Sequence, residues 1–313
     1  MRLDDFDPDI DVGDQRGRGG GMGFGGGGGG GGGMLLGLLP LVFSRFGCGG
    51  VAVLLAVVFF MGGGLPLISG GALIPTSQVG QTPAGTGADR GTSGGTAAQR
   101  ACTVDAASRS ACNAFTSANK TWQALFAQAG QPYRAPSLQF YGGQGQSGCG
   151  AAQAAMGPFY CPSDNGIYLD TSFFDELANR FGAKGDFAAN YVMAHEFGHH
   201  IQTLLGTSDQ VRRAQSSASR TEGNALSVKL ELQADCYAGV WGAANRARLD
   251  PGDVEEGLTA AQAIGDDTLQ RQAQGQVVPD SFTHGSSADR AKWLKRGLDT
   301  GDPAQCDTFS GAN

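Results

Sequence analysis

The stretch His195-Glu196-Phe197-Gly198-His199 decides how this chain is interpreted. On a helix, His195 and His199 lie one turn apart on the same face, with Cβ atoms roughly 5–6 Å apart. That spacing lets both imidazoles reach one zinc ion. Glu196 stands beside the first histidine, where its carboxylate can reach a water molecule on the metal. The pattern therefore predicts a helix that carries a metal site.

We expect this helix to begin with Asp186 as its N-cap and to stop at Gly206. Gly198 lies inside it, and a glycine within a helix costs about 1 kcal/mol relative to alanine. Another segment should therefore approach the helix closely beside the metal. His200 points about 100° away from His199 around the helix, so it cannot easily share the same zinc. We expect His200 to be packed or hydrogen-bonded at the helix edge.

A catalytic zinc site needs three protein ligands and an open fourth position. The position six residues after His199 is Leu205, so a third histidine does not follow there. Glu231 is the best candidate, because Asp235 lies one turn beyond it on a helix predicted from Leu226 to Asn245. Glu231 can bind zinc while Asp235 accepts the outer N–H of a zinc-bound imidazole. The alternative is a solvated acidic pair, which the apolar neighbours of these residues disfavour.

The composition bounds the domain organisation. Only 16% of the 313 residues are charged, the formal net charge is −7, and no block of basic residues indicates a nucleic-acid partner. The sequence predicts a cytoplasmic, glycine-rich, disordered tail over residues 1–46. Residues 69–100 are expected to be a flexible linker, and residues 101–313 the folded domain.

Residues 47–68 form an apolar run that is long enough to cross a membrane as one helix. A cleaved signal peptide is the alternative, but it fits poorly because the run starts late, after a glycine tract. Arg16, Arg18 and Arg45 all precede the run. This bias predicts a single-pass protein of the cell membrane with a cytoplasmic N-terminus and an extracytoplasmic domain.

The cysteines agree with that location. Of seven cysteines, Cys48 lies in the apolar run and the other six lie beyond it. An even set outside the membrane indicates disulfides, although buried thiols are the alternative. Six cysteines allow fifteen pairings. Short loops favour Cys102–Cys112 and Cys149–Cys161. These two bridges leave Cys236–Cys306 as the third.

Apolar spacing indicates an α+β domain that is mostly helical. Besides the two helices above, it predicts helices over residues 101–130, 172–181, 253–265 and 287–298. Short strands are expected at residues 138–141, 159–161 and 167–169, the last two forming a hairpin around Asn165-Gly166.

Three stretches together resemble the neutral zinc metallopeptidases, a family of membrane-anchored bacterial proteins within the gluzincin group. They are H-E-F-G-H-H at 195–200, E-L-Q-A-D-C-Y-A-G-V-W at 231–241 and T-H-G-S-S-A-D-R-A-K-W at 283–293. The resemblance covers about residue 101 to the C-terminus. It implies a zincin-like fold and a zinc cofactor, with His195, His199 and Glu231 as ligands and Glu196 as general base.

His284 is the only histidine outside the cluster, and it precedes a predicted helix. It can either stabilise the oxyanion of a peptidase or belong to a helix cap with Ser286, and the resemblance favours the first role. The same resemblance makes Arg290 a candidate for orienting site carboxylates. The sequence thus predicts a membrane-anchored zinc endopeptidase acting on peptides or proteins. A scaffold with a structural zinc and a hydrolase of non-peptide amides are the alternatives.

Overall fold

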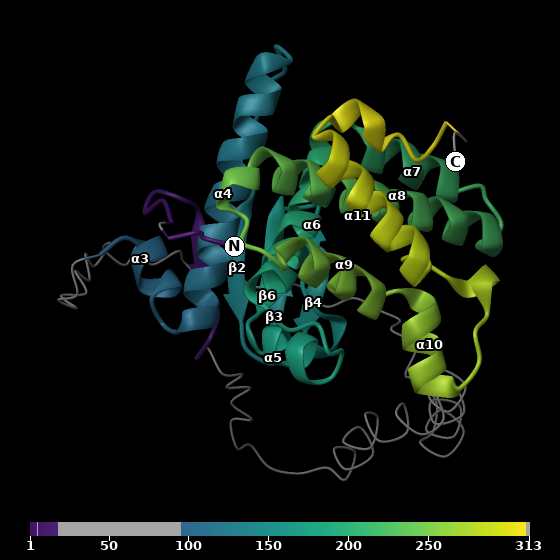
Figure 1. Ribbon diagram of the computed structural model, residues 1–313, viewed down its shortest axis with the longest axis horizontal. Helices are drawn as coiled ribbons and strands as arrows, with labels where there is room; N and C mark the ends of the chain where they lie inside the picture. Colours follow the sequence, from purple (N-terminus) through teal and green to yellow (C-terminus); the bar gives the residue numbers. More distant parts are fainter. Residues whose placement is uncertain (5, 18–94, 311–313) are drawn as a thin grey trace, which may run out of the picture. The chain divides into compact units, whose positions relative to one another are not determined.

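The computed structural model describes residues 1–4, 6–17 and 95–310 (Figure 1). Helices predominate over strands in these residues, so the α+β, mostly helical class is confirmed. The predicted membrane helix at residues 47–68 lies outside the described residues. Within them, no helix combines the length and the apolar character that a membrane span requires.

One sheet of four strands has the order β1-β2-β6-β5. β1 and β6 each pair in parallel with β2, whereas β5 pairs antiparallel with β6 and forms an edge. The predicted hairpin is therefore confirmed, and Asn165 in its turn has a φ of 55°. β3 and β4 form a separate antiparallel pair that the sequence did not predict. The strands are β1 Val12–Asp14, β2 Ser137–Tyr141, β3 Gln144–Ser147, β4 Gly150–Gln153, β5 Phe159–Cys161 and β6 Gly166–Asp170.

The N-terminal segment belongs to the same compact unit as the domain. β1 extends the sheet, and the N-terminal ammonium of Met1 lies 2.8 Å from Asp186 Oδ1 and 3.1 Å from Asp253 Oδ1. Arg16 donates to the carbonyl of Ala101 at 2.9 Å. The prediction of a disordered tail separated from the domain by a membrane is therefore wrong for the described part of this segment. Long-range strand pairing and ion pairs order it, and its own composition does not reveal them.

Of the described helices, two lie between β1 and β2 along the chain and the others follow β6. The helices are α3 Ala97–Cys102, α4 Ala106–Gln128, α5 Ser172–Asn179, α6 Asp186–Leu204, α7 Thr207–Gln215, α8 Arg220–Ala244, α9 Asp253–Ala263, α10 Asp266–Gln274 and α11 Ser287–Thr300. Short 3-10 turns are η1 Ala154–Met156, η2 Arg246–Arg248, η3 Pro279–Ser281 and η4 Pro303–Cys306.

Several predicted boundaries shift for local reasons. The helix predicted over 101–130 is two helices, because Asp105 caps α4 and interrupts the run. α6 begins at Asp186 as predicted, but its N-cap is Gly185, whose φ of 112° favours glycine. α8 begins at Arg220, earlier than predicted, where Ser219 and Glu222 form a capping box.

α8 packs against both α6 and α11, and the three helices lie together in Figure 1. A Cβ built on Gly198 of α6 would lie 2.9 Å from the carbonyl oxygen of Ala234 in α8. This close approach confirms the reason expected for a glycine at that position. Gly239 of α8 and Gly297 of α11 form a similar contact, in which a Cβ on Gly239 would lie 2.8 Å from the Gly297 Cα. The glycines therefore bring side chains of three helices to one place.

All three predicted disulfides are confirmed. The first joins α3 to α4, the second joins the β3–β4 turn to β5, and the third joins α8 to η4. Their Cα–Cα distances are 5.9 Å for Cys102–Cys112, 5.8 Å for Cys149–Cys161 and 5.5 Å for Cys236–Cys306.

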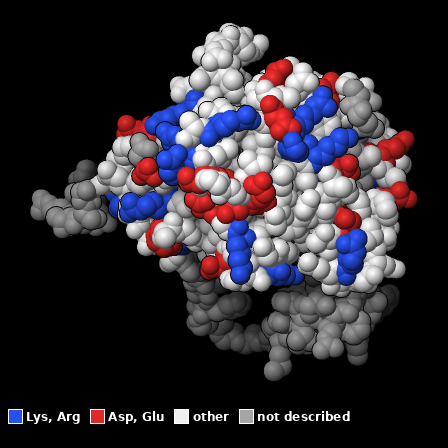
Figure 2. Space-filling view, in the orientation of Figure 1, with Lys and Arg blue, Asp and Glu red and all other residues white. Residues whose placement is uncertain are grey.

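The described surface carries charges of both signs. On the face drawn in Figure 2, basic and acidic side chains are interspersed. This distribution accompanies a formal net charge of −7 over the whole sequence. The expectation that the chain does not bind nucleic acid stays a prediction.

Candidate metal centre

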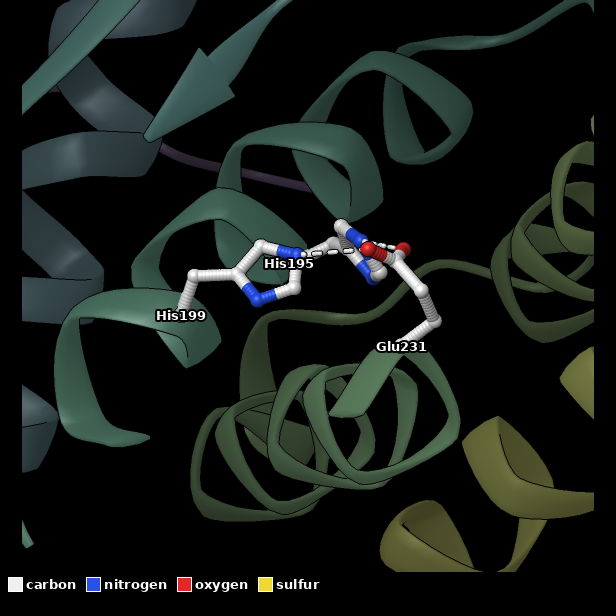
Figure 3. Close-up of side chains that lie close together, drawn as sticks. All are labelled: His195, His199 and Glu231. Atoms are coloured by element: carbon white, nitrogen blue, oxygen red, sulfur yellow. Dashed lines mark hydrogen bonds and ion pairs between the residues drawn. The ribbon is translucent and has the colours of Figure 1, made fainter. Parts of the chain in front are cut away.

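Two histidines of α6 and one glutamate of α8 come together where these helices cross. His195 Nε2 lies 3.1 Å from Glu231 Oε2, and His199 Nε2 lies 3.4 Å from Glu231 Oε1. One ligand atom from each residue lies within 4.8 Å of the other two. Figure 3 shows both rings and the carboxylate pointing toward one another. Two imidazole nitrogens and a carboxylate oxygen are a donor set that zinc accepts, so the residues present fit this ion.

The Asp235 carboxylate forms a hydrogen bond to the His195 ring on the side away from the metal position. His195 Nδ1 donates to Asp235 Oδ1 at 2.8 Å, which leaves Nε2 free to face the metal position. Asp235 also accepts from the Tyr191 hydroxyl at 2.6 Å and from Arg290 Nε at 2.9 Å. The structure thus brings Asp235 and Arg290 together behind His195. Tyr191 was missed, although its position four residues before His195 was an available signal.

An amide holds the second imidazole. His199 Nδ1 lies 2.9 Å from Gln202 Oε1, and the Gln202 amide donates to the Leu230 carbonyl at 2.7 Å. Because the Gln202 oxygen can only accept, Nδ1 of His199 carries the proton and Nε2 faces the metal position. The sequence analysis also missed Gln202. It follows His199 by three residues, which places it on the same face of α6.

Burial and neighbouring charges shift the pKa values of the candidate ligands in opposite directions. Burial alone would raise the pKa of Glu231, but the facing imidazoles outweigh burial and hold that pKa well below its usual range. Burial alone would lower the pKa of His195, yet the charge and hydrogen bond of Asp235 raise it to about 10. A metal ion must therefore displace protons from the histidines, so metal binding should weaken as the pH falls.

A cleft of about 720 Å³ runs along the three candidate ligands. Glu196 also lines it and is only 7% exposed, and burial raises the pKa of its carboxyl group. The cleft therefore combines a possible metal position with a second carboxylate. Its wall includes the apolar side chains Met156, Phe159, Phe173, Phe181 and Val192.

A family comparison agrees with this donor set. The family described as "Putative neutral zinc metallopeptidase" matches residues 1–309. The chain belongs to this family. The match includes the N-terminal segment, so the zinc metallopeptidase family extends over more of the chain than the motifs indicated.

Relatives of this family member occur in Escherichia coli and in Mycobacterium tuberculosis. It is 56% identical over 191 residues to uncharacterized protein YpfJ of Escherichia coli K12, covering 60% of this chain and 67% of that protein. It is 43% identical over 210 residues to uncharacterized protein Rv2575 of Mycobacterium tuberculosis H37Rv, covering 63% of this chain and 69% of that protein. No solved structure matches the chain.

His284 of this family member lines the same cleft as the three candidate ligands. Its Nδ1 lies 3.2 Å from Asp266 Oδ1, and about half of the side chain is exposed. The hydrogen bond with Asp266 raises the pKa of His284. Ser286, and not His284, caps α11, because the Ser286 side chain accepts from the Asp289 N–H.

His200 has partners away from the candidate ligands, as expected for a histidine at the helix edge. Its Nε2 donates to the carbonyl of Arg134 at 2.7 Å, and its Nδ1 lies 3.2 Å from the Tyr160 hydroxyl. Burial lowers the pKa of His200 to about 4, so the ring is neutral near pH 7. This histidine connects α6 to β5 and to the segment before β2.

Proposed function

We propose that the chain is a zinc endopeptidase in which His195, His199 and Glu231 hold the metal. The observation that carries this proposal is the convergence of these three side chains on a cleft that Glu196 also lines. The family supports both the metal and the peptidase activity. A zinc ion held there supplies a Lewis acid and lowers the pKa of a water molecule toward about 7.

Glu196 acts as the general base in this proposal. It takes a proton from the attacking water and passes that proton to the leaving amine. Burial raises the pKa of Glu196, which makes the carboxylate a better base. Asp235 and Arg290 keep the His195 ring in one orientation during the reaction. His284, protonated more readily because of Asp266, donates a hydrogen bond to the oxyanion from the cleft wall.

A scaffold with a structural zinc is the competing function. Structural zinc sites close with a fourth protein ligand, and they need no carboxylate beside the first histidine. The described residues bring three potential ligands together here, and Glu196 is buried beside them. Both features favour catalysis over a structural role.

The test is metal analysis of the full chain together with a peptide-library cleavage assay. The full chain is needed because a fragment of residues 101–313 would lack β1 and most of α3. We expect one zinc ion per chain, none in His195→Ala, and full zinc without cleavage in Glu196→Gln. Cleavage by Glu196→Gln at the wild-type rate would refute the proposed base. A zinc-loaded chain that cleaves no peptide would refute the peptidase.

A further inference from the structure

Two buried glutamines connect a candidate zinc ligand to a disulfide. Gln202 Oε1 lies 2.9 Å from His199 Nδ1, and Gln202 Nε2 donates to the Leu230 carbonyl at 2.7 Å. The same Nε2 donates to Gln233 Oε1 at 3.2 Å, and Gln233 Nε2 donates to the Cys306 carbonyl at 3.0 Å. Gln202 is 0% and Gln233 is 6% exposed, so solvent hardly competes for these bonds.

The donor and the acceptor of each hydrogen bond between Cys306, Gln233, Gln202 and His199 are fixed. The carbonyls of Leu230 and Cys306 can only accept, so each amide must turn its nitrogen toward a backbone oxygen. Gln233 therefore presents its oxygen to Gln202, and Gln202 presents its oxygen to His199. A flipped amide would place two donors or two acceptors in contact, and buried groups without partners are costly. Only one tautomer of His199 fits this arrangement.

The far end of the chain of hydrogen bonds is held covalently. Cys306 ends η4 and is joined to Cys236 of α8, one turn after Gln233. Both sulfur-bearing residues are 0% exposed. The position of the Cys306 carbonyl, which orients Gln233, thus depends on the Cys236–Cys306 bridge.

We propose that Gln202 and Gln233 are positioning residues that hold His199 for zinc and make zinc affinity depend on the Cys236–Cys306 disulfide. This inference rests on the zinc site of the proposed function. Gln202 fixes the ring of His199 on α6 and also binds the Leu230 carbonyl on α8, next to Glu231. It therefore sets the placement of ligands from two helices. Loss of such an outer partner typically weakens metal binding 10–100-fold.

The first experiment measures zinc affinity of the full chain by competition with a chelator. We expect Gln202→Met, which keeps the length of the side chain, to bind zinc about 10–100-fold more weakly than wild type. Gln233→Met should weaken binding less, because the Leu230 carbonyl still orients Gln202. Cobalt in place of zinc gives a second readout, since its visible absorption reports ligand geometry. That spectrum should change in Gln202→Met even at saturating cobalt.

The second experiment tests the disulfide. Cys236→Ser/Cys306→Ser should bind zinc more weakly than Cys102→Ser/Cys112→Ser, a matched control that also removes one buried bridge. The decisive comparison adds Gln233→Met to each pair. If the connection runs through Gln233, opening the Cys236–Cys306 bridge should cost little further affinity in the Gln233→Met background.

Wild-type zinc affinity in Gln202→Met, or equal affinities for the two cysteine pairs, would overturn the inference. The inference would also be overturned if the losses of zinc affinity caused by Gln233→Met and by opening the Cys236–Cys306 bridge were additive. If the chain without the third bridge does not fold, wild-type zinc affinity in Gln233→Met would still overturn the dependence on the disulfide, because the bridge is linked to His199 through Gln233. A wild-type chain that binds no zinc would overturn this inference and the proposed metal site together. Zinc binding without peptide cleavage would refute only the peptidase.

Discussion

Replacing Gly198 with alanine tests whether the close contact of α6 and α8 sets the metal site. The new Cβ would lie 2.9 Å from the Ala234 carbonyl oxygen and 3.0 Å from the Ala234 Cα. Both are backbone atoms, so no side chain can rotate away to relieve the contact. To reach ordinary contact at 3.4 Å, the helices must separate by about 0.5 Å.

Two opposing effects set the change in the free energy of unfolding of Gly198→Ala. Alanine is favoured over glycine within a helix by about 1 kcal/mol, whereas overpacking a tight core costs about 1–3 kcal/mol. Gly198→Ala should therefore lower the free energy of unfolding by about 0–2 kcal/mol. The effect on zinc should be larger, because metal sites tolerate distance changes of only about 0.2 Å. Moving Glu231 away from His195 and His199 should weaken zinc binding about tenfold or more.

The assay is denaturant unfolding of the metal-free chain together with chelator competition for zinc. Gly223→Ala is the control, since it lies in α8 with nothing within 4 Å of the added Cβ. The free energy of unfolding of Gly223→Ala should rise by about 1 kcal/mol, and this variant should bind zinc like wild type. A Gly198→Ala protein that is as stabilised as the control and binds zinc like wild type would refute the reasoning.

Three other outcomes are expected. His284→Ala should retain zinc and lose about 10²–10³ in kcat with little change in KM; loss of zinc or a near-normal kcat would assign it another role. The Asp266 hydrogen bond raises the pKa of His284 above 6.5. This pair therefore stabilises the fold fully below pH 6.5, and the stabilisation is lost as the pH rises through the folded-state pKa of His284. NMR titration should show that Asp266→Asn lowers the pKa of His284. Asp235→Ala should cost about 3–5 kcal/mol in denaturant unfolding by leaving buried Arg290 unpaired, and adding Arg290→Met should restore part of the loss.

The parts that the sequence predicted are those governed by local patterns. The histidine motif lies on a long helix with a marked start and end, so α6 was predicted almost to its ends. Glu231 and Asp235 were identified because helical spacing relates them. Short sequence separations favoured the pairing of Cys102–Cys112 and Cys149–Cys161, and the structure contains both.

The parts that were missed depend on distant partners. β1 is a strand because it pairs with β2, while its own residues Val12–Asp14 include glycine and aspartate, which are rare in strands. β3 and β4 consist of glycine, glutamine, serine and alanine, so they show no apolar alternation. Gln202 appears as an ordinary polar residue until the Leu230 carbonyl lies beside it.

The parallel pairing of β1 with β2 also restricts how the chain can relate to a membrane. Hydrogen-bonded neighbours in one sheet must occupy the same compartment, so Val12–Asp14 and Leu138–Phe140 share a side. Wherever the metal centre is located, the N-terminus is located with it. The compartment that holds Met1 is thus also the compartment in which the cleft lies.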